Sequence, residues 1–386
     1  MKRRNGACVI PREQNDVKTK TENKQAIFRY ILNHGSATKQ LLFTDLGLSL
    51  PTIKQALQTL EAEKLIARGH VVKNTGGRNA VSYIAAAKNW FAIGIFLSLH
   101  HFICVSVDMN GEILYTKRAD CQLDLHDSDY MGQLADMIEQ VRVQTGLPEA
   151  QLLGVGIAIP SLVGEDGEST VYGMTSDFTG ITRKYFEDYI PYPVRIYHDS
   201  ETAGFAEVWR TESPMNMVYL SLNSSVGSSV YLRGKLYAGD NGRAGELGHM
   251  VIDTHSGRRC YCGRVGCFDT LCNTIVLDSY CEGSLPRFFA LLAAGDSGAA
   301  ARWETYTENL ALAIHNLKML FDCTIVIGGY IGAYIGPFLD DLYKKVDARS
   351  IFTPFSRTYV FPCKFKTEAT AAGAALRVLD QFVNGL

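Results

Sequence analysis

The feature that most constrains this chain is a short segment, past its middle, that gathers one histidine and three cysteines. The set is His-x10-Cys-x-Cys-x4-Cys and consists of His249, Cys260, Cys262 and Cys267. Zn²⁺ prefers four soft or borderline ligands in a tetrahedron, and three thiolates with one imidazole form a standard structural set. Three thiols so close together cannot all pair as disulfides. We therefore predict that these residues bind one structural zinc ion.

Glycines in the same segment favour a tight loop around an ion. Gly257, Gly263 and Gly266 lie beside the cysteines, and glycine adopts backbone conformations that other residues avoid. The alternative interpretation is three buried cysteines and one unrelated surface histidine, which is the usual risk of a motif match. We favour zinc because all four candidate ligands are of the right type within one short segment.

The segment also carries a resemblance to a known family. The run GELGHM at residues 245–250, followed by Cys-x-Cys-Gly-x-x-Gly-Cys, resembles the signature of the ROK family (repressor, open reading frame, kinase). That family comprises sugar kinases and sugar-responsive repressors with an actin-like fold of two lobes. The resemblance implies that Glu246 and His249 contact a sugar, and that His249 also binds the zinc ion.

Length and cysteine usage predict a protein of two or three domains in a reducing compartment. At 386 residues the chain is too long for one small core. Its ten cysteines are clustered in the zinc segment or scattered, which does not suit a disulfide framework. The basic N-terminus has no apolar signal-peptide core, and no run reaches the ~18 apolar residues of a membrane helix. We expect a cytoplasmic protein with no membrane partner.

The charge is divided unevenly along the chain. Residues 1–80 hold 14 Lys and Arg against 6 Asp and Glu, a balance of +8, whereas the remainder has a balance of −10. A basic segment attached to an acidic body indicates a polyanionic partner for the first part alone. The alternative is a basic face that is merely solvated.

Residues 1–88 follow the order of a winged helix-turn-helix protein. Residues 1–22 are polar with little periodicity, and we expect a flexible basic arm. From Lys24 apolar residues recur at helical spacing as far as Gly35, and a second short helix ends near Gly47. We therefore assign residues 23–88 to a winged helix-turn-helix domain.

The third helix of this domain is the candidate element for reading DNA. Ser49 predicts its N-cap, and two strands near 66–73 and 79–84 follow it. The order resembles the DNA-binding domain of ROK repressors, including a Gly-Gly-Arg wing, and it predicts binding to double-stranded operator DNA. A three-helix structural or protein-binding module is the alternative. The predicted DNA contacts are Ser49, Pro51, Thr52, Lys54, Gln55 and Gln58 of the helix and Gly76, Gly77 and Arg78 of the wing.

Residues 89–386 predict a body of two similar halves. Strand-like runs with an Asn-Gly hairpin precede a helix at 128–144 and a buried strand at 152–160, and strand runs recur from 217. The ROK resemblance implies that this body has an α/β, actin-like (ribonuclease H-like) sugar kinase fold with a zinc loop at 245–269. Ligands in such a fold are expected between the lobes.

The resemblance also implies further sugar contacts. His198 and Asp199 stand where ROK kinases have an Asn-Asp pair whose Asp is the general base. Because His replaces Asn, binding by Asp199 is expected, whereas its catalytic role is in doubt; taken alone, such an Asp predicts a helix N-cap. Asp177 and Gly180 stand in the family's Asn-x-x-Gly-Trp contact, with Asp for Asn and Ile181 for Trp. The implied sugar site is Asp177, Gly180, His198, Asp199, Glu246 and His249.

The motifs for phosphoryl transfer are missing. ROK kinases have an Asp-x-Gly-Gly-Thr hairpin at the first strand, whose Asp helps to hold Mg²⁺ and whose glycines close on phosphate oxygens. The corresponding stretch here, residues 94–100, has Phe96 and Ser98-Leu99, and the second phosphate loop, residues 223–227, keeps one glycine. We therefore expect no ATP-dependent kinase activity.

Together these features predict a sugar-responsive transcriptional repressor of carbohydrate-metabolism genes, in the branch similar to the xylose and N-acetylglucosamine repressors. Its effector would be a sugar or a sugar phosphate, and it would act as a homodimer or homotetramer. The alternative is a ROK sugar kinase with an atypical nucleotide site. A zinc hydrolase is disfavoured because four protein ligands leave no open position for water.

Overall fold

The computed structural model describes residues 12–72, 80–164, 166–172, 179–211, 215–255, 258–353 and 355–386, with the backbone alone for residues 12–19 and 72. The chain divides into two compact units. Unit 1 holds the described residues up to Phe91, with Asp108–Asn110 and Leu379–Leu386. Unit 2 holds Ala92–Val107 and Gly111–Val378.

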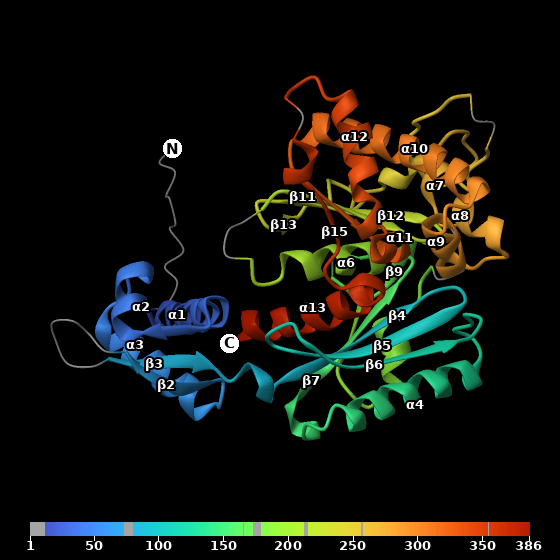
Figure 1. Cartoon of the computed structure of the whole chain (residues 1–386). Helices are drawn as coiled ribbons and strands as arrows, with labels where there is room; N and C mark the ends of the chain where they lie inside the picture. Colours follow the sequence, from blue (N-terminus) through green and yellow to red (C-terminus); the bar gives the residue numbers. More distant parts are fainter. Residues whose placement is uncertain are drawn as a thin grey trace, which may run out of the picture. The chain divides into compact units, whose positions relative to one another are not determined.

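Unit 1 combines three helices with a small antiparallel sheet of strand order β1-β3-β2. Buried side chains such as Ile27, Phe28 and Leu57 form its core. The helices and strands of this unit up to residue 91, coloured blue in Figure 1, are α1 (Arg12–His34), β1 (Ser36–Thr38), α2 (Lys39–Leu46), α3 (Leu50–Ala62), β2 (Ile66–Val72) and β3 (Ala80–Ala85).

The predicted third helix of unit 1 is confirmed as α3. The Ser49 side chain caps it by accepting a hydrogen bond from the backbone N–H of Thr52 at 3.3 Å. The stripe Ile53, Ala56, Leu57 and Leu60 is buried, as its spacing predicts. The cap and the stripe are local signals, and both could be read from the sequence.

The first helix is longer than its sequence pattern indicates. It begins at Arg12, although apolar periodicity starts only near Lys24. Residues 12–23 contain no Gly or Pro, so nothing in the sequence interrupts a helix that extends from the packed part. The second half of the stretch expected to be a flexible arm is therefore helical.

The end of α13 (Ala369–Gly385) completes unit 1. Asp380 accepts a hydrogen bond from the Arg29 guanidinium of α1 at 2.8 Å. Phe382 stacks on Trp90, with ring centroids 5.8 Å apart. The C-terminal residues of the chain thus pack with residues from its first helix.

Unit 2 is built on two five-stranded mixed sheets, with strand orders β10-β7-β4-β5-β6 and β13-β12-β11-β14-β15. We call the part around the first sheet lobe 1 and the part around the second lobe 2. The strands of lobe 1 are β4 (Phe91–Leu97), β5 (His101–Asp108), β6 (Ile113–Asp120), β7 (Leu152–Ile159) and β10 (Val194–His198). Those of lobe 2 are β11 (Met217–Leu222), β12 (Val226–Leu232), β13 (Lys235–Leu236), β14 (Thr324–Gly328) and β15 (Val360–Pro362).

Each sheet joins an antiparallel hairpin to parallel strands. In lobe 1, β5 pairs antiparallel with β6, and β7 pairs parallel with β10. In lobe 2, β11 pairs antiparallel with β12 and parallel with β14. A separate ribbon joins β8 (Leu162–Val163) to β9 (Thr170–Tyr172). The repetition confirms the predicted α/β fold of two similar halves.

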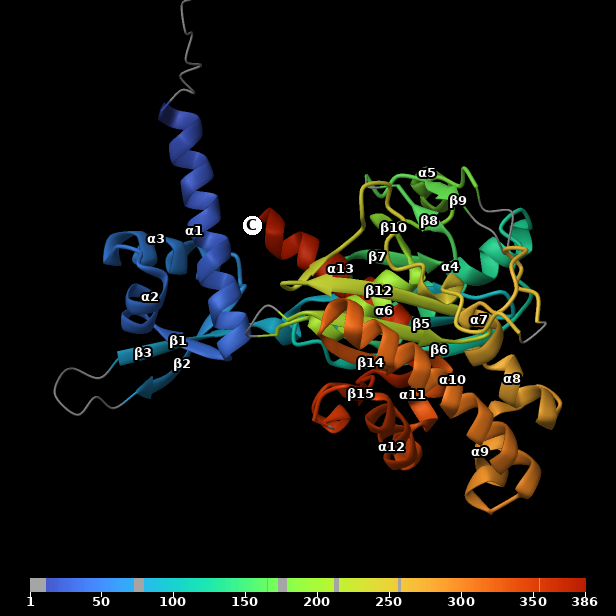
Figure 2. The same ribbon diagram turned by 90° about the horizontal axis from the view of Figure 1, so that it is seen from above.

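Two helices pack between the sheets of unit 2, and others cover their outer faces. Figure 1 shows α6 (Asp199–Val208) and the first part of α13 in the middle. Seen from above in Figure 2, the long helix α10 lies across the strands of lobe 2. The remaining helices are α4 (Ser128–Gln144), α5 (Arg183–Glu187), α7 (Phe268–Cys272), α8 (Ile275–Asp278), α9 (Leu285–Ala293), α10 (Ser297–Phe321), α11 (Gly329–Tyr334) and α12 (Leu339–Arg349). No helix in the described ranges is long and apolar enough to cross a membrane.

A close backbone approach fixes α13 against lobe 1. A Cβ atom on Gly94 of β4 would lie 1.9 Å from the carbonyl oxygen of Ala371. Such a separation is far inside van der Waals contact, so only glycine fits here. Gly94 lies in the stretch that the family resemblance matches to the kinase hairpin, and in this structure it serves the packing of β4 against α13.

We expect Gly94→Ala to destabilise unit 2 by about 3 kcal/mol, because the new methyl group forces the strand and helix apart. Thermal unfolding followed by circular dichroism measures the effect. Gly132→Ala in α4 is the matched control, since its Cβ would meet no atom within 4 Å and alanine favours a helix. Equal unfolding temperatures for Gly94→Ala and the wild type would contradict this account of the packing.

Candidate ligand cleft and metal site

A cavity of about 1180 Å³ lies in unit 2 and is lined from both lobes. This volume is slightly above the range of about 300–1,000 Å³ that is usual for small-molecule sites. Lobe 1 contributes the ends of β4, β7 and β10, and lobe 2 contributes the loop before β12 and the residues after it. The lining side chains include Phe96, Ser98, Ser161, His198, Asp199, Asn223, Glu246, His249, Tyr261 and Asp269.

Asp199 stands at the corner between β10 and α6. It is the first residue of the helix, and its carboxylate accepts a hydrogen bond from the Ser200 N–H at 2.6 Å. Burial raises the pKa of Asp199, although His198 and the Ser200 N–H oppose that shift and Glu246 adds to it. His198 Nε2 lies 3.3 Å from the same carboxylate. The N-cap predicted for Asp199 is wrong by one residue: His198 occupies that position without a side-chain cap, and Asp199 is the first residue of α6, with its carboxylate lining the cavity.

Glu246 is carried by a turn that is anchored to β12. The Ser228 hydroxyl donates to the Gly245 carbonyl and accepts from the Leu247 N–H. A Cβ on Gly248 would lie 2.2 Å from the Val226 carbonyl oxygen, so the turn sits directly on the strand. This close contact explains why position 248, between Glu246 and His249, is a glycine.

The four residues predicted to bind metal come together. Their ligand atoms lie within 4.8 Å of one another, with His249 Nδ1 3.6 Å from Cys260 Sγ and Cys262 Sγ 3.7 Å from Cys267 Sγ. The Arg264 N–H lowers the pKa of the Cys262 thiol. One nitrogen and three sulfurs at these separations are the donor set of a structural zinc site.

Asp269 is a cavity residue that the sequence interpretation did not assign. Its carboxylate accepts a hydrogen bond from the Val226 N–H at 2.6 Å, and burial raises its pKa. This bond joins the end of the predicted zinc loop, residues 245–269, to the first residue of β12, which also belongs to the loop at residues 223–227. Its only sequence signal is a carboxylate two residues after Cys267, which does not by itself identify a partner 43 residues away.

Arginines also line the cavity and were not predicted. Arg258 and Arg259 come from the metal loop, Arg243 precedes Glu246, and Arg302 is on α10. They face a cavity that Asp199, Glu246 and Asp269 also line. The cavity therefore offers cationic groups as well as carboxylates to a ligand.

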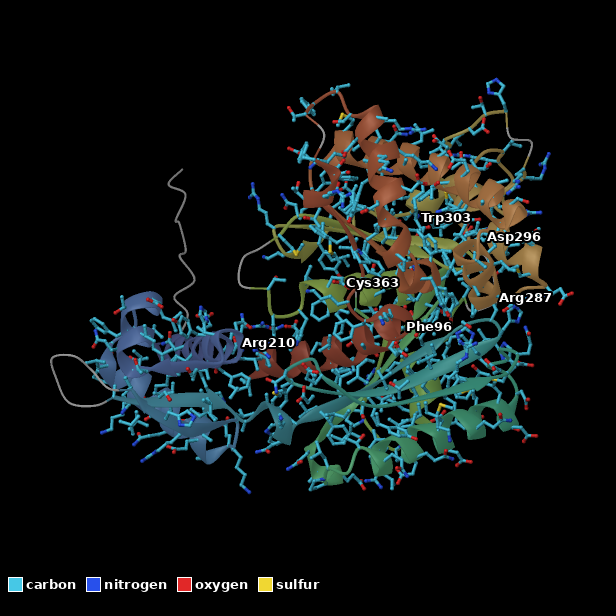
Figure 3. All side chains as sticks on the ribbon, in the orientation of Figure 1. Phe96, Arg210, Arg287, Asp296, Trp303 and Cys363 are labelled. Atoms are coloured by element: carbon cyan, nitrogen blue, oxygen red, sulfur yellow. The ribbon has the colours of Figure 1, made fainter. Side chains whose placement is uncertain are left out.

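One predicted sugar contact lies away from this cavity, and several other predicted residues are outside the described part of the chain. Asp177 lies outside the described residues, as do Gly76, Gly77 and Arg78. Gly180 is described, and it donates its N–H to the Thr170 carbonyl at 2.9 Å without lining the cavity. Phe96, labelled in Figure 3, lies near the end of β4, in the stretch that the family resemblance matches to the kinase hairpin, and its ring packs edge-on against His101.

In unit 1 the predicted DNA-contact residues of α3 share one surface. Ser49, Pro51, Lys54, Gln55 and Gln58 are exposed, and Thr52 is half-buried beneath the Ser49 hydroxyl. Their side chains are polar or cationic apart from Pro51. Ser49, Pro51, Thr52 and Lys54 lie near the N-terminal end of the helix, and Gln55 and Gln58 lie further along it. The N-terminal end of a helix carries a partial positive charge, which suits a phosphate.

Comparison with known proteins agrees with this architecture. The chain is similar to the xylose repressor of Bacillus subtilis, at 22% identity over 95% of this chain and 97% of that repressor. Among solved structures it is similar to a ROK family transcriptional regulator described as a homologue of the E. coli MLC protein, with a TM-score of 0.74, 21% identity, and coverage of 95% of this chain and 98% of that one.

A kinase structure also shares the fold. The ROK family glucokinase of Streptomyces griseus, solved with glucose and AMPPNP, gives a TM-score of 0.60 at 18% identity and covers 74% of this chain and 98% of its own. The family model described as ROK family matches residues 92–381, which is most of the chain. The chain therefore belongs to the ROK family.

Proposed function

We propose that the protein is a sugar-responsive transcriptional repressor of carbohydrate-metabolism genes. Residues 23–88 would form the winged helix-turn-helix domain, and residues 89–386 the body that binds a sugar or sugar phosphate. The observation that carries the proposal is the pairing, in one chain, of a basic unit that presents a polar helix with a ROK body that lacks the kinase hairpin residues. The similarity to the xylose repressor along nearly the whole chain supports it.

The topology of unit 1 supports a role in DNA binding. Its order of helix, strand, two helices and two strands is that of a winged helix, with α3 as the recognition helix. Lys54, Gln55 and Gln58 are exposed on that helix, where glutamine suits adenine and lysine suits guanine or phosphate. A two-fold homodimer or homotetramer would match paired half-sites. A cytoplasmic location, which the sequence predicts, would suit this role.

The cavity of unit 2 supports a carbohydrate effector. The half-buried Asp199 carboxylate and the Glu246 carboxylate would accept hydrogen bonds from sugar hydroxyls, while Tyr172 and Tyr261 add ring surface. Because arginines also line the cavity, a sugar phosphate is favoured over an unphosphorylated sugar as the effector. Sugar binding would regulate DNA affinity only if it favours one conformation over another.

We also propose that the His249, Cys260, Cys262 and Cys267 set holds a structural zinc ion. The donor types and separations fit it, and a fourth protein ligand leaves no open position for a reacting water. Zinc would supply a fixed crosslink between the turn that carries Glu246 and the loop that follows it. His249 would then be held in place three residues from Glu246, which orients that carboxylate toward the cavity.

A sugar kinase is the second candidate, because the glucokinase of Streptomyces griseus shares the fold. Phe96 cannot hold Mg²⁺, and loss of that ion removes much of the stabilisation of a phosphoryl-transfer transition state. A coupled assay with ATP and a panel of hexoses separates the two functions. Turnover at the rate of ordinary kinases, about 1 per second or more, would replace the repressor proposal.

The first prediction from this proposed function concerns DNA. Binding of the full chain to fragments selected from its own genome should weaken steeply with salt, because phosphate contacts release counterions. Lys54→Ala should weaken binding to all fragments and lower the salt slope by about 1, whereas Gln55→Ala should cost about 1–3 kcal/mol mainly on the preferred sequence. Lys344→Ala, an exposed lysine of α12, is the control for lost charge. Salt-independent binding would contradict the proposal.

The second prediction concerns the effector. A thermal-shift screen with xylose, glucose, N-acetylglucosamine and their phosphates should find a stabilising ligand, since binding to the native state raises its stability. Asp199→Asn and Glu246→Gln should each weaken that ligand at least tenfold and leave DNA affinity unchanged, because each removes a charged hydrogen-bond acceptor. Glu149→Gln, an exposed carboxylate outside the cavity, should have no effect. Wild-type affinity in both cleft variants would place the ligand elsewhere.

The third prediction concerns the metal. Purified protein should contain about one zinc per chain, following the count of four ligands. Cys260→Ser and Cys267→Ser should lose the metal, lower the unfolding temperature and weaken the sugar response together, because metal binding stabilises the loop. Cys121→Ser changes a cysteine of lobe 1 outside the set and should do none of these. Elemental analysis without zinc, together with normal sugar responses of both variants, would refute the assignment.

A further inference from the structure

A hydrogen bond joins the two lobes of unit 2 behind the cleft. Nε2 of His101, on β5 of lobe 1, is bonded to the hydroxyl of Tyr330, on α11 of lobe 2. Neither residue lines the cavity, and the His101 side chain is almost fully buried. The two residues are 229 positions apart, so their contact depends on how the lobes are arranged.

On the side of lobe 1, His101 is also bonded to the turn between β4 and β5, which faces the cavity. The other ring nitrogen of His101, Nδ1, lies 2.7 Å from the Ser98 hydroxyl. The Ser98 N–H donates to the His101 carbonyl at 2.9 Å, which closes the turn between β4 and β5. Ser98 itself lines the cavity. A ligand that touches this turn would therefore act on His101 through Ser98.

On the side of lobe 2, Tyr330 is also bonded to the loop after β11, which faces the cavity. The backbone N–H of Tyr330 donates to the side-chain oxygen of Asn223 at 2.8 Å, and the Asn223 amide donates to the Ser221 hydroxyl at 3.0 Å. Asn223 lines the cavity and begins the loop that leads to Gly227. Both polar ends of the Asn223 side chain are thus engaged in holding this loop.

The His101 imidazole and the Tyr330 phenol are both uncharged at neutral pH, as these hydrogen bonds require. Burial, with Arg118, lowers the pKa of His101 to about 4, against a weaker opposite effect of Asp120. Burial raises the pKa of Tyr330 to about 12. At neutral pH the imidazole is uncharged and has one donor and one acceptor nitrogen, while the phenol keeps its proton. One ring nitrogen therefore donates and the other accepts.

We propose that Ser98, His101, Tyr330 and Asn223 form an interlobe clasp that couples the two ligand-facing loops and holds the lobes in the arrangement that binds the effector. Two-lobed proteins open and close about hinges, and a direct bond between lobes favours the closed arrangement. The clasp joins the two loops at the positions where the kinase motifs would grip phosphate. Its role in effector binding rests on the proposed function, whereas its effect on the lobes does not.

Hydrogen exchange of the full chain, without ligand or DNA, tests the clasp. Tyr330→Phe removes the hydroxyl and keeps the ring, so peptides covering residues 97–102 and 222–227 should exchange at least threefold faster at neutral pH. Peptides from α4 should exchange at the wild-type rate. Tyr334→Phe, on the same helix with its ring stacked on Phe289, is the control and should resemble the wild type. Unchanged exchange at 97–102 in Tyr330→Phe would overturn the proposal.

A second variant separates the clasp from a general loss of stability. His101→Gln should accelerate the same two peptides, and the double variant with Tyr330→Phe should go little further, because both changes break one bond. Additive acceleration, or acceleration throughout unit 2 including α4, would also overturn the clasp. Any sugar that stabilises the wild type should bind Tyr330→Phe severalfold more weakly. If no sugar binds, the exchange result still decides the clasp, and the proposed function fails separately.

Discussion

The turn at Glu246–His249 is the constraint on which the cleft depends. It is held on one side by the Ser228 hydroxyl and by contact between Gly248 and β12. On the other side it meets the cysteines, which bring three thiols to the same imidazole. Bound zinc would turn the proximity of these groups into folding free energy. The same short turn thus determines where Glu246 points and where the following loop begins.

Much of the fold could be predicted because its signals are local. The helix at Ser128–Gln144 has both of its predicted ends, and the Asn110–Gly111 turn joins β5 to β6 as expected. Caps, apolar periodicity and glycine turns act within a few residues, so one sequence is enough to find them. The short strand β1 and the early start of α1 escaped prediction. The first has only three residues, and the second lacks an apolar stripe.

The candidate site was predictable where one segment supplies it and unpredictable where distant segments meet. His249 and the cysteines lie within one loop, so their spacing predicts the ligand set. Asp269 with Val226, and His101 with Tyr330, join residues that are 43 and 229 positions apart. Periodicity identifies which side chains are buried, but it does not identify their partners. Such contacts require the fold itself.

The charges of the cleft restrict the kind of ligand that it can select. Asp199 and Glu246 repel each other, and burial further disfavours the ionised form of Asp199. A ligand that brings hydroxyl donors between the two carboxylates replaces the lost hydration and relieves the repulsion. A carboxylate or phosphate at that place would add to the repulsion. An acidic group of the ligand is therefore expected toward the arginines, and a polyol toward the carboxylates.

The proposed clasp would also explain how a body with a kinase-like fold could act as a sensor. Phosphoryl transfer needs a metal and a donor held across both loops, and the ring of Phe96 offers no metal ligand. In this chain Ser98, His101, Tyr330 and Asn223 join the two loops. If no phosphoryl donor binds, the binding energy of a ligand is available to favour one arrangement of the lobes. Regulation requires no more than that difference in affinity between arrangements.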